Sequence, residues 1–252
     1  GDPFVSLTIS FLIIIGGIGF LTWDDIKANK LNFKKYRTQS KTIIFTTFLL
    51  LLLPTIYFYF WEFQDYSFGD RILASFFQST TPRTAGFNTV NLNAMSQAGQ
   101  ILLAILMLIG GSPGGTAGGM KTTTLAVLVA NTRAVFTRSN EAHVFKRRIP
   151  DETIKNAATI AMMYIVLCVG SALFVSRVES CTFVEAVFET ASAVGTVGLT
   201  LGITPGLHAA SKIVLILLMF LGRVGGLTII FAALPATKNK YSKLPQDRIA
   251  VG

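Results

Sequence analysis

Residues 183–200 read FVEAVFETASAVGTVGLT, an apolar run of about 11 residues that leads into a loop built on Thr-Val-Gly-Leu. A membrane-spanning helix needs about 20 mostly apolar residues, so this run is too short to cross a bilayer. Its length is typical of a re-entrant or interfacial segment. Non-helical backbone is tolerated at membrane depth only where it is buried in protein or lines a water-filled cavity. The stretch therefore indicates a short pore helix followed by a loop along an ion path.

A second copy of this arrangement lies 112 residues earlier, where an apolar run at 68–78 is followed by TTPRTAGFN at 80–88. In such a unit the carbonyl end of the helix points toward the pore, and glycine permits the unusual backbone angles of the loop. Thr-x-Gly alone is a weak signal, but two copies behind short helices are a strong one. The same shift aligns, without a gap, Phe76 with Phe188, Thr84 with Thr196, Gly86 with Gly198, Gly110 with Gly222, Gly114 with Gly226 and Thr116 with Thr228.

The composition places these loops in a multi-span membrane protein. Only 14% of the 252 residues are charged and 51% are hydrophobic, whereas a soluble domain carries about 25% charged residues. This balance argues against a soluble globular enzyme. The net charge of +9 does not indicate nucleic-acid binding, because the basic residues lie between long apolar runs. Five spans are predicted, at 4–23, 43–61, 100–135 with a long interruption, 154–176 and 209–234.

The basic residues orient these spans. Fifteen of the 22 lysines and arginines lie on three segments that alternate with the spans, and the positive-inside rule makes these segments cytoplasmic. The C-terminus is then cytoplasmic, and both short helices lie on the external side, whose connectors carry few basic residues (Arg71, Arg83 and Arg177). Topology alone explains the basic segments, and docking of a cytoplasmic partner is the alternative. The three segments hold Lys27, Lys30, Lys34, Lys35, Arg37 and Lys41; Arg133, Arg138, Lys146, Arg147 and Arg148; and Lys238, Lys240, Lys243 and Arg248.

The repeat divides the chain into three parts and predicts an all-α membrane protein of M1–pore-loop–M2 units, like those of potassium channels. Residues 1–41 are the second span (M2) of a preceding unit with a cytoplasmic loop, because Gly16-Gly17-Ile18-Gly19 aligns with Gly222-Arg223-Val224-Gly225. Residues 42–150 form a complete unit with an interrupted M2, and residues 151–252 form another with a cytoplasmic tail. A filter of this kind needs about four loops. The chain is therefore either the C-terminal part of a longer protein, which the orphan first span favours, or one of several copies around a pore.

A glycine-rich segment interrupts the third predicted span. Six glycines and a proline cannot hold a regular helix, since glycine costs about 1 kcal/mol per site and proline about 3 kcal/mol. A small-residue packing face would explain one or two of these glycines. A phosphate-binding loop is disfavoured, because Met120 separates Gly119 from Lys121 and no strand precedes the segment. We predict that the helix breaks at mid-membrane, within Gly110, Gly111, Ser112, Pro113, Gly114, Gly115, Thr116, Ala117, Gly118 and Gly119.

Four charged residues lie in or beside the predicted path. Arg223 falls well inside the last span, at a position where the other units have glycine. A charge buried in a bilayer costs at least about 2.5 to 3.5 kcal/mol, so Arg223 is expected to face a cavity or a partner. There it repels a cation in the path, or pairs with a carbonyl or carboxylate. Lys121 can snorkel to the surface, while Glu185 and Glu189 either concentrate cations at the external mouth or bridge to neighbouring residues.

Together these motifs resemble the Ktr/Trk/HKT superfamily of potassium transporters, most closely the membrane subunits of bacterial Ktr systems. The motifs are TAGFN at 84–88, TVGL at 196–199, GGSPGGTAGG at 110–119 and GRVGG at 222–226, and the match covers the whole chain. Members of that family carry four M1–pore-loop–M2 repeats in one polypeptide, with one glycine in each filter loop. The resemblance implies a potassium filter lined by the carbonyls of Thr84, Ala85, Gly86, Phe87, Thr196, Val197, Gly198 and Leu199, completed by two loops outside this chain.

The resemblance also implies a gate and partners. Residues 110–119 would form an intramembrane loop below the filter, with Arg223 contributing to gating. The family pattern implies potassium as the transported ion, sodium dependence, a homodimer in the bacterial cell membrane and a cytosolic ring of nucleotide-binding regulatory subunits of the KtrA/TrkA type. No organic cofactor, nucleic-acid partner or enzymatic activity is expected. The alternatives are the potassium-binding membrane subunit of an ATP-driven pump, which the short connectors argue against, and a membrane-bound enzyme, for which no convergent polar constellation is seen.

Overall fold

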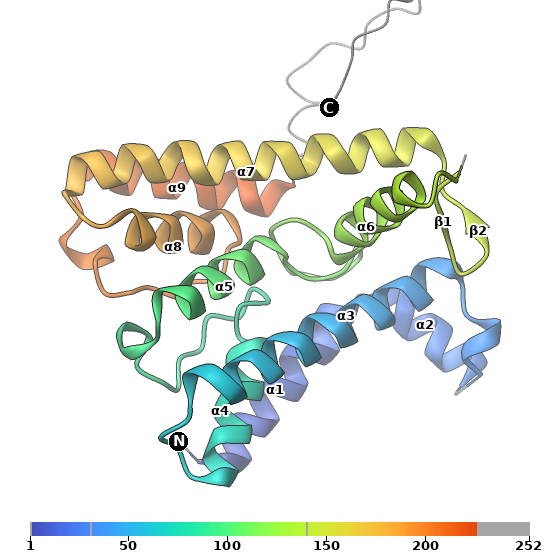
Figure 1. Cartoon of the computed structure of the whole chain (residues 1–252), viewed down its shortest axis with the longest axis horizontal. Helices are drawn as coiled ribbons and strands as arrows, with labels where there is room; N and C mark the ends of the chain where they lie inside the picture. The colour runs from blue at the N-terminus through green and yellow to red at the C-terminus, as the bar shows by residue number, and fades with distance from the viewer. Residues whose placement is uncertain (1, 31, 140, 226–252) are drawn as a thin grey trace, which may run out of the picture.

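The computed structural model of the chain describes residues 2–30, 32–139 and 141–225, and it confirms the predicted helical architecture (Figure 1). In the described part, a two-stranded antiparallel hairpin accompanies the helices. The elements are α1 (Pro3–Ile18), α2 (Phe20–Asn29), α3 (Thr38–Tyr57), α4 (Phe68–Thr80), α5 (Gln97–Leu108), α6 (Thr122–Phe136), β1 (His143–Val144), β2 (Arg147–Arg148), α7 (Asp151–Glu179), α8 (Phe183–Val194) and α9 (Ala209–Val224).

The unit at 42–150 has the predicted order of a long span, a short helix and a broken span. α3 continues through a π-helical turn (Phe58–Glu62), and the resulting 25-residue segment is long and apolar enough to cross a membrane. Ser67 caps the start of α4, because its hydroxyl accepts a hydrogen bond from the Asp70 amide. α4 packs against α3. α5 and α6 are the two halves of the interrupted span, separated by residues 109–121.

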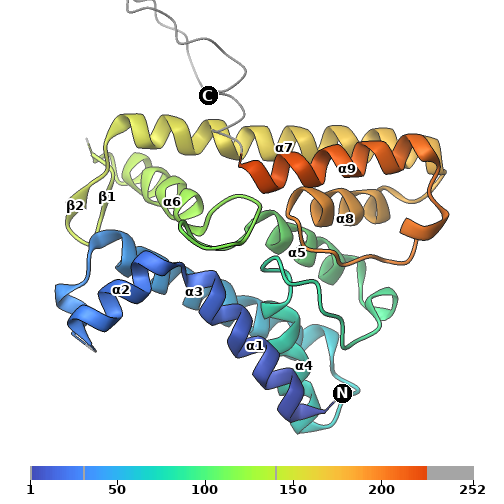
Figure 2. The same ribbon diagram turned by 180° about the vertical axis from the view of Figure 1, so that it is seen from behind.

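The unit that begins at residue 151 repeats this order. α7 is a 29-residue apolar helix that meets the length of a span on its own. α8 starts with a capping box between Thr182 and Glu185 and packs against α5, α7 and α9. The short helices α4 and α8 lie toward one end of the molecule, whereas α2 and the β-hairpin lie toward the other (Figures 1 and 2). This arrangement agrees with the predicted separation of the pore helices from the basic segments.

The first span differs from its prediction, because the helix bends by 92° within residues 4–23. α1 ends and α2 begins at Gly19, whose backbone has φ 87° and ψ 146°. Residues with a side chain rarely adopt this φ, and a Cβ at Gly19 would also lie 2.5 Å from the Pro113 carbonyl oxygen. The span predicted over 4–23 is therefore a bent pair of helices, which only together are long and apolar enough to cross a membrane. Close approach of the glycine-rich loop is the physical reason for the bend.

The last span begins as predicted. α9 covers residues 209–224 and ends at Gly225, whose φ of 88° and ψ of 133° nearly equal those of the aligned Gly19. α1 and α9 thus end at aligned glycines with nearly the same backbone conformation. The rest of the predicted span, up to residue 234, and the basic segment that follows it lie outside the described residues.

Large apolar side chains cover the outer faces of the long helices. Met162 and Leu173 on α7 are 63% and 60% exposed, and Ile216 and Phe220 on α9 are 60% and 63% exposed. Soluble proteins rarely expose contiguous apolar patches of this extent. The packed interior lies instead around α5, α8 and α9, where Phe188 is fully buried. The outer surface is therefore suited to contact with lipid.

Asp25 fastens the turn between α2 and α3. Its carboxylate accepts hydrogen bonds from the Ser40 hydroxyl at 2.5 Å and from the Arg37 amide at 3.1 Å. The Ser40 hydrogen bond is the main cause that lowers the pKa of Asp25 below its ordinary value. Because a lowered carboxyl pKa favours the folded state only when the group is ionised, this contribution is present above about pH 4 and is lost in more acidic solution.

Candidate functional site: the filter loops and the glycine-rich loop

The two predicted filter loops have matching backbones. Thr84 and Thr196 both have positive φ, of 60° and 53°, and the glycines two residues later, Gly86 and Gly198, have φ of 72° and 96°. Positive φ is uncommon for residues other than glycine. Its occurrence at aligned positions of both loops indicates that the two segments form the same local structure.

Hydrogen bonds to the preceding helix hold each loop in place. The Val197 and Gly198 amides donate to the backbone oxygen and the hydroxyl of Ser192, at 2.9 and 3.1 Å. In the first loop, the Ala85 and Gly86 amides both donate to the Thr81 carbonyl, at 3.3 and 3.2 Å. Because a trans peptide places its carbonyl opposite its amide hydrogen, the Val197 carbonyl points away from α8.

The two loops face each other across this carbonyl. A Cβ built on Gly86 would collide with the Val197 oxygen, so glycine at 86 permits the close approach of the second loop. A Cβ on Gly198 would meet no atom within 4 Å in the described structure, so only its φ demands glycine there. The structure thus brings the two sets of predicted filter residues together.

The glycine-rich loop breaks the third span as predicted and is closed at its base. The Gly110 amide donates to the Met120 carbonyl at 2.8 Å, and the Met120 amide donates to the Leu108 carbonyl at 3.1 Å. The hydroxyls of Ser112 and Thr122 lie 2.9 Å apart and form a buried hydrogen bond. Backbone groups freed from the helix therefore find partners within the protein, which non-helical backbone at membrane depth requires.

The same loop connects the first and last M2 helices. The Ser112 amide donates to the Gly17 carbonyl at 2.9 Å, and the Phe20 amide donates to the Gly114 carbonyl at 3.3 Å. At the other side, the Gly119 amide donates to the Gly222 carbonyl at 3.2 Å. The loop is thereby fixed between α1 and α9.

The glycine-rich loop also touches the second filter loop. A Cβ on Gly118 would collide with the side chain of Thr196, whose hydroxyl is buried and has no hydrogen-bond partner among the described residues. The loop therefore lies directly against the residue at which the filter sequence begins. This contact places the predicted gate beside the predicted filter.

Two positively charged side chains donate hydrogen bonds to carbonyls of the glycine-rich loop. Arg223 donates from Nη1 to the Thr116 carbonyl, and Lys121 donates from Nζ to the Ala117 carbonyl at 2.5 Å. Arg223 is thus paired with a carbonyl, one of the two roles expected for it. Its side chain is exposed in the described structure rather than buried. Lys121 is half-buried against the loop instead of extending to a surface.

Both carboxylates on α8 bridge to neighbours. Glu185 completes the capping box with Thr182. Glu189 is 4% exposed, and it accepts hydrogen bonds from the Thr200 hydroxyl, the Leu201 amide at 3.1 Å and the Thr204 hydroxyl at 2.7 Å. Glu189 therefore fastens the loop that leaves the second filter segment.

Replacing Glu189 by glutamine is expected to lower the free energy of unfolding by about 3 kcal/mol, because an amide cannot accept all three bonds and charged hydrogen bonds contribute about 1.5–3 kcal/mol each. Glu185→Gln is the matched control one turn earlier, since glutamine also serves in a capping box. Thermal unfolding of the purified protein in detergent measures both. Equal shifts for the two variants would show that Glu189 has no special role.

Arg83 is buried, whereas the charge pattern places it in an external connector. Its side chain is 4% exposed, and Nη2 donates to the Thr47 hydroxyl at 3.3 Å. Gly17 on α1 leaves room for the guanidinium, since a Cβ there would lie 3.7 Å from Nη2. At the aligned position the second unit has Gly195, where a Cβ would collide with the Met107 carbonyl. The signal in the sequence is an arginine inside an otherwise small and neutral filter loop.

Among residues 2–30, 32–139 and 141–225, no group of three or more His, Cys, Asp or Glu side chains could hold a metal ion. The two filter loops contain neither histidine, cysteine, aspartate nor glutamate, and their oxygens are backbone carbonyls and threonine hydroxyls.

Paired pore helices, matching loops and a glycine-rich loop beside them define a pore-loop membrane protein. Residues 1–243 match the TrkH family of cation transport proteins, and the chain belongs to that family. The chain is 38% identical to the potassium/sodium uptake protein NtpJ of Enterococcus hirae and 33% identical to the Ktr system potassium uptake protein B of Bacillus subtilis. All of this chain and 58% of each relative take part in these matches.

A solved structure has the same fold. The potassium transporter TrkH from Vibrio parahaemolyticus superposes with a TM-score of 0.75 at 21% identity, over 93% of this chain and 53% of that one. The predicted resemblance to the Ktr/Trk superfamily is therefore confirmed. The relatives are ion transporters, not enzymes, and the chain spans little more than half of their length.

Proposed function

We propose that this chain forms part of the ion path of a potassium uptake protein in the bacterial plasma membrane, with its C-terminus in the cytoplasm. The observation that carries the proposal is the facing pair of filter loops, with the same positive φ values at aligned residues and the Val197 carbonyl directed toward Gly86. Carbonyls of residues 84–87 and 196–199 would replace the water around a potassium ion, together with loops outside this chain.

Below the filter, residues 110–119 would act as the barrier to flow. Their support is the contact between Gly118 and Thr196 and the hydrogen bonds that fix the loop to α1 and α9. Arg223 and Lys121 would hold the barrier closed through the carbonyls of Thr116 and Ala117. Two positive charges next to the path also oppose the entry of a cation.

Sodium and partner subunits enter the proposal through the relatives. One is named a potassium/sodium uptake protein, and others are named for a Ktr system. We infer a sodium-dependent transporter that works as a homodimer on a cytosolic ring of KtrA-like subunits. Such a partner would dock on the basic cytoplasmic segments.

Growth of a potassium-uptake-deficient strain on low potassium tests the proposal. The full-length gene that contains this sequence is expected to restore growth, and potassium uptake into those cells is expected to rise. A protein that inserts into the membrane and yet gives neither growth nor uptake would overturn the assignment. Sodium dependence is measured in the same cells by varying external sodium at fixed potassium.

A further inference from the structure

A groove of about 640 Å³ is lined by residues of α3, α6, α7 and the β-hairpin. Figure 1 shows the hairpin beside the start of α7. Its hairpin end carries Arg147 and Arg148, and neutral polar side chains of all three helices, such as Thr38 and Asn156, line it further. Val127 and Ile160 form an apolar wall beyond them. Within the described part of the chain, no aspartate or glutamate lines the groove.

The groove is long enough to reach from a headgroup region to the first part of an acyl chain. Its lining on α7 runs from Thr153 to Ile160, which corresponds to a rise of about 10 Å at 1.5 Å per residue. The polar end lies at the start of α7, on the side that the basic segments mark as cytoplasmic. Past Ile160, α7 exposes the apolar side chains that face lipid, such as Met162.

Packing fixes the hairpin so that its arginines are held at the groove. The Phe145 ring at the hairpin turn contacts Phe33 and Phe45 edge-on, with centroids 6.1 and 6.2 Å apart. The Ile149 amide donates to the Ala142 carbonyl at 2.9 Å and closes the base of the hairpin. These tertiary contacts fix the hairpin backbone beside the groove, while the side chains of Arg147 and Arg148 are exposed.

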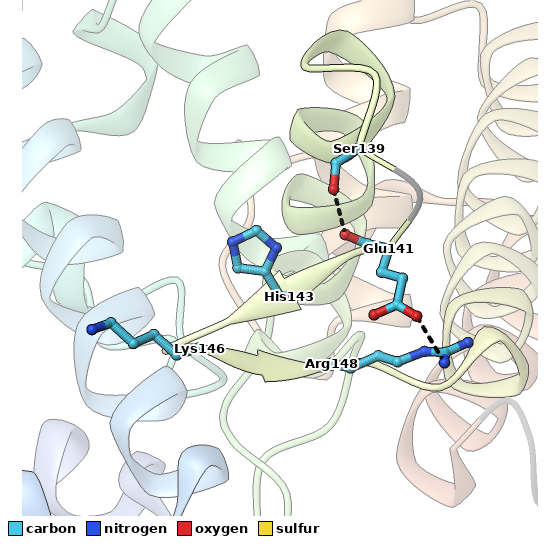
Figure 3. Close-up of a pocket in the computed structure, with 5 residues that line it drawn as sticks. All are labelled: Ser139, Glu141, His143, Lys146 and Arg148. Atoms are coloured by element: carbon cyan, nitrogen blue, oxygen red, sulfur yellow. Dashed lines mark hydrogen bonds and ion pairs between the residues drawn. The ribbon is translucent and has the colours of Figure 1, made fainter.

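The other side of the hairpin has a different character. Figure 3 shows Glu141 paired with Arg148, at 2.9 Å, while His143 and Lys146 extend away from that pair. That open, polar pocket has charges of both signs. Arg148 belongs to both sides, because it also lines the groove, whereas Arg147 makes no ion pair among the described residues. An arginine without a carboxylate partner, next to an apolar wall, is the complement of an anionic, chain-bearing ligand.

We propose that this groove binds an anionic phospholipid of the cytoplasmic leaflet. Arg147 binds the headgroup phosphate, with Arg148 beside it although Arg148 also pairs with Glu141. The threonine and asparagine side chains donate further hydrogen bonds, and an acyl chain lies along Val127 and Ile160. Asp151 and Glu152 occupy the first turn of α7. The arginines, not the helix end, therefore supply the positive charge. The proposal rests on the cytoplasmic orientation of this face, as in the proposed function.

Native mass spectrometry of the purified full-length protein with phosphatidylglycerol, against phosphatidylcholine of the same chains, tests the site. Wild-type protein is expected to retain phosphatidylglycerol preferentially. The double variant Arg147→Gln with Arg148→Gln is expected to weaken that binding roughly tenfold to thirtyfold, because each basic residue near an anionic headgroup contributes about 1 kcal/mol. Lys34→Gln with Lys35→Gln is the control, since this exposed basic pair lies on the same cytoplasmic face outside the groove.

A second variant keeps the arginines and blocks the apolar wall. Ile160→Trp is expected to reduce phosphatidylglycerol binding as well. Inorganic phosphate added as a competitor to the wild-type protein is expected to leave phosphatidylglycerol binding unchanged. Equal loss in the lysine control, no lipid preference in the wild type, or competition by inorganic phosphate would each overturn the proposal. Loss of a cytosolic protein partner without loss of lipid would assign the groove to that partner instead. Lipid binding is measured without transport, so its failure is distinct from failure of potassium uptake.

Discussion

Replacing Gly198 by serine is expected to reduce the preference for potassium over sodium by roughly tenfold or more. Gly198 has φ 96°, which a residue with a Cβ adopts only under strain. The described structure leaves open space around the added side chain, so relief comes from backbone rotation rather than from displacement of neighbours. That rotation turns the Val197 carbonyl away from the path and removes a ligand that distinguishes ions by coordination.

A matched control separates filter chemistry from loop strain. Gly202 lies four residues later and has φ 97°, and an added Cβ there would also meet no described atom within 4 Å. Gly202→Ser therefore imposes the same backbone cost outside the filter and is expected to keep ion preference. Rubidium and sodium uptake into cells that express each variant measures the ratio. Unchanged selectivity in Gly198→Ser, or the same change in both variants, would refute the filter assignment.

Replacing Arg223 by glutamine is expected to raise potassium flux about tenfold to a hundredfold when the closed state predominates. The Arg223 guanidinium donates to the Thr116 carbonyl of the glycine-rich loop. A hydrogen bond to a charged group contributes about 1.5–3 kcal/mol, and each 1.4 kcal/mol changes an equilibrium about tenfold. The substitution also removes a positive charge next to the path, which favours cation entry.

Lys212→Gln provides the control on the same helix. Lys212 donates to the Pro205 carbonyl at 3.2 Å, so this change also removes a cation from a loop carbonyl, but at the opposite end of α9. Its flux is expected to equal that of the wild type. Deletion of residues 112–117 should raise flux further, because it removes the barrier itself. A wild-type rate in Arg223→Gln, or a rate at or below wild type in the deletion, would exclude the gate proposal.

The repeated architecture was predictable because local signals and a sequence repeat agree. Apolar length separates the long spans from the pore helices, and the shift of 112 residues pairs the two loops. Their matching φ values follow from the same Thr-x-Gly sequence at 84–86 and 196–198. The break at 110–119 was predictable too, since no arrangement of six glycines and a proline supports a regular helix.

What the sequence could not predict depends on contacts between distant segments. The bend at Gly19 exists because the Pro113 carbonyl approaches from a loop about 90 residues away, and a hydropathy pattern carries no such information. The charge pattern places Arg83 among the external charges, because burial of an arginine requires the gap that Gly17 leaves in another helix. Glu189 has its role only because the chain returns to it at residues 200–204.

The bend between α1 and α2 lets a movement of α2 act on the glycine-rich loop. α2 leaves α1 at 92°, and its first amide, Phe20, holds the Gly114 carbonyl of the glycine-rich loop. A rotation of α2 about Gly19 would therefore move the Phe20 amide and, through its hydrogen bond, the Gly114 carbonyl of the loop. The Asp25–Ser40 contact couples the same arm to α3. A conformational change at the cytoplasmic end of α2 would thus alter the glycine-rich loop while α1 stays unchanged.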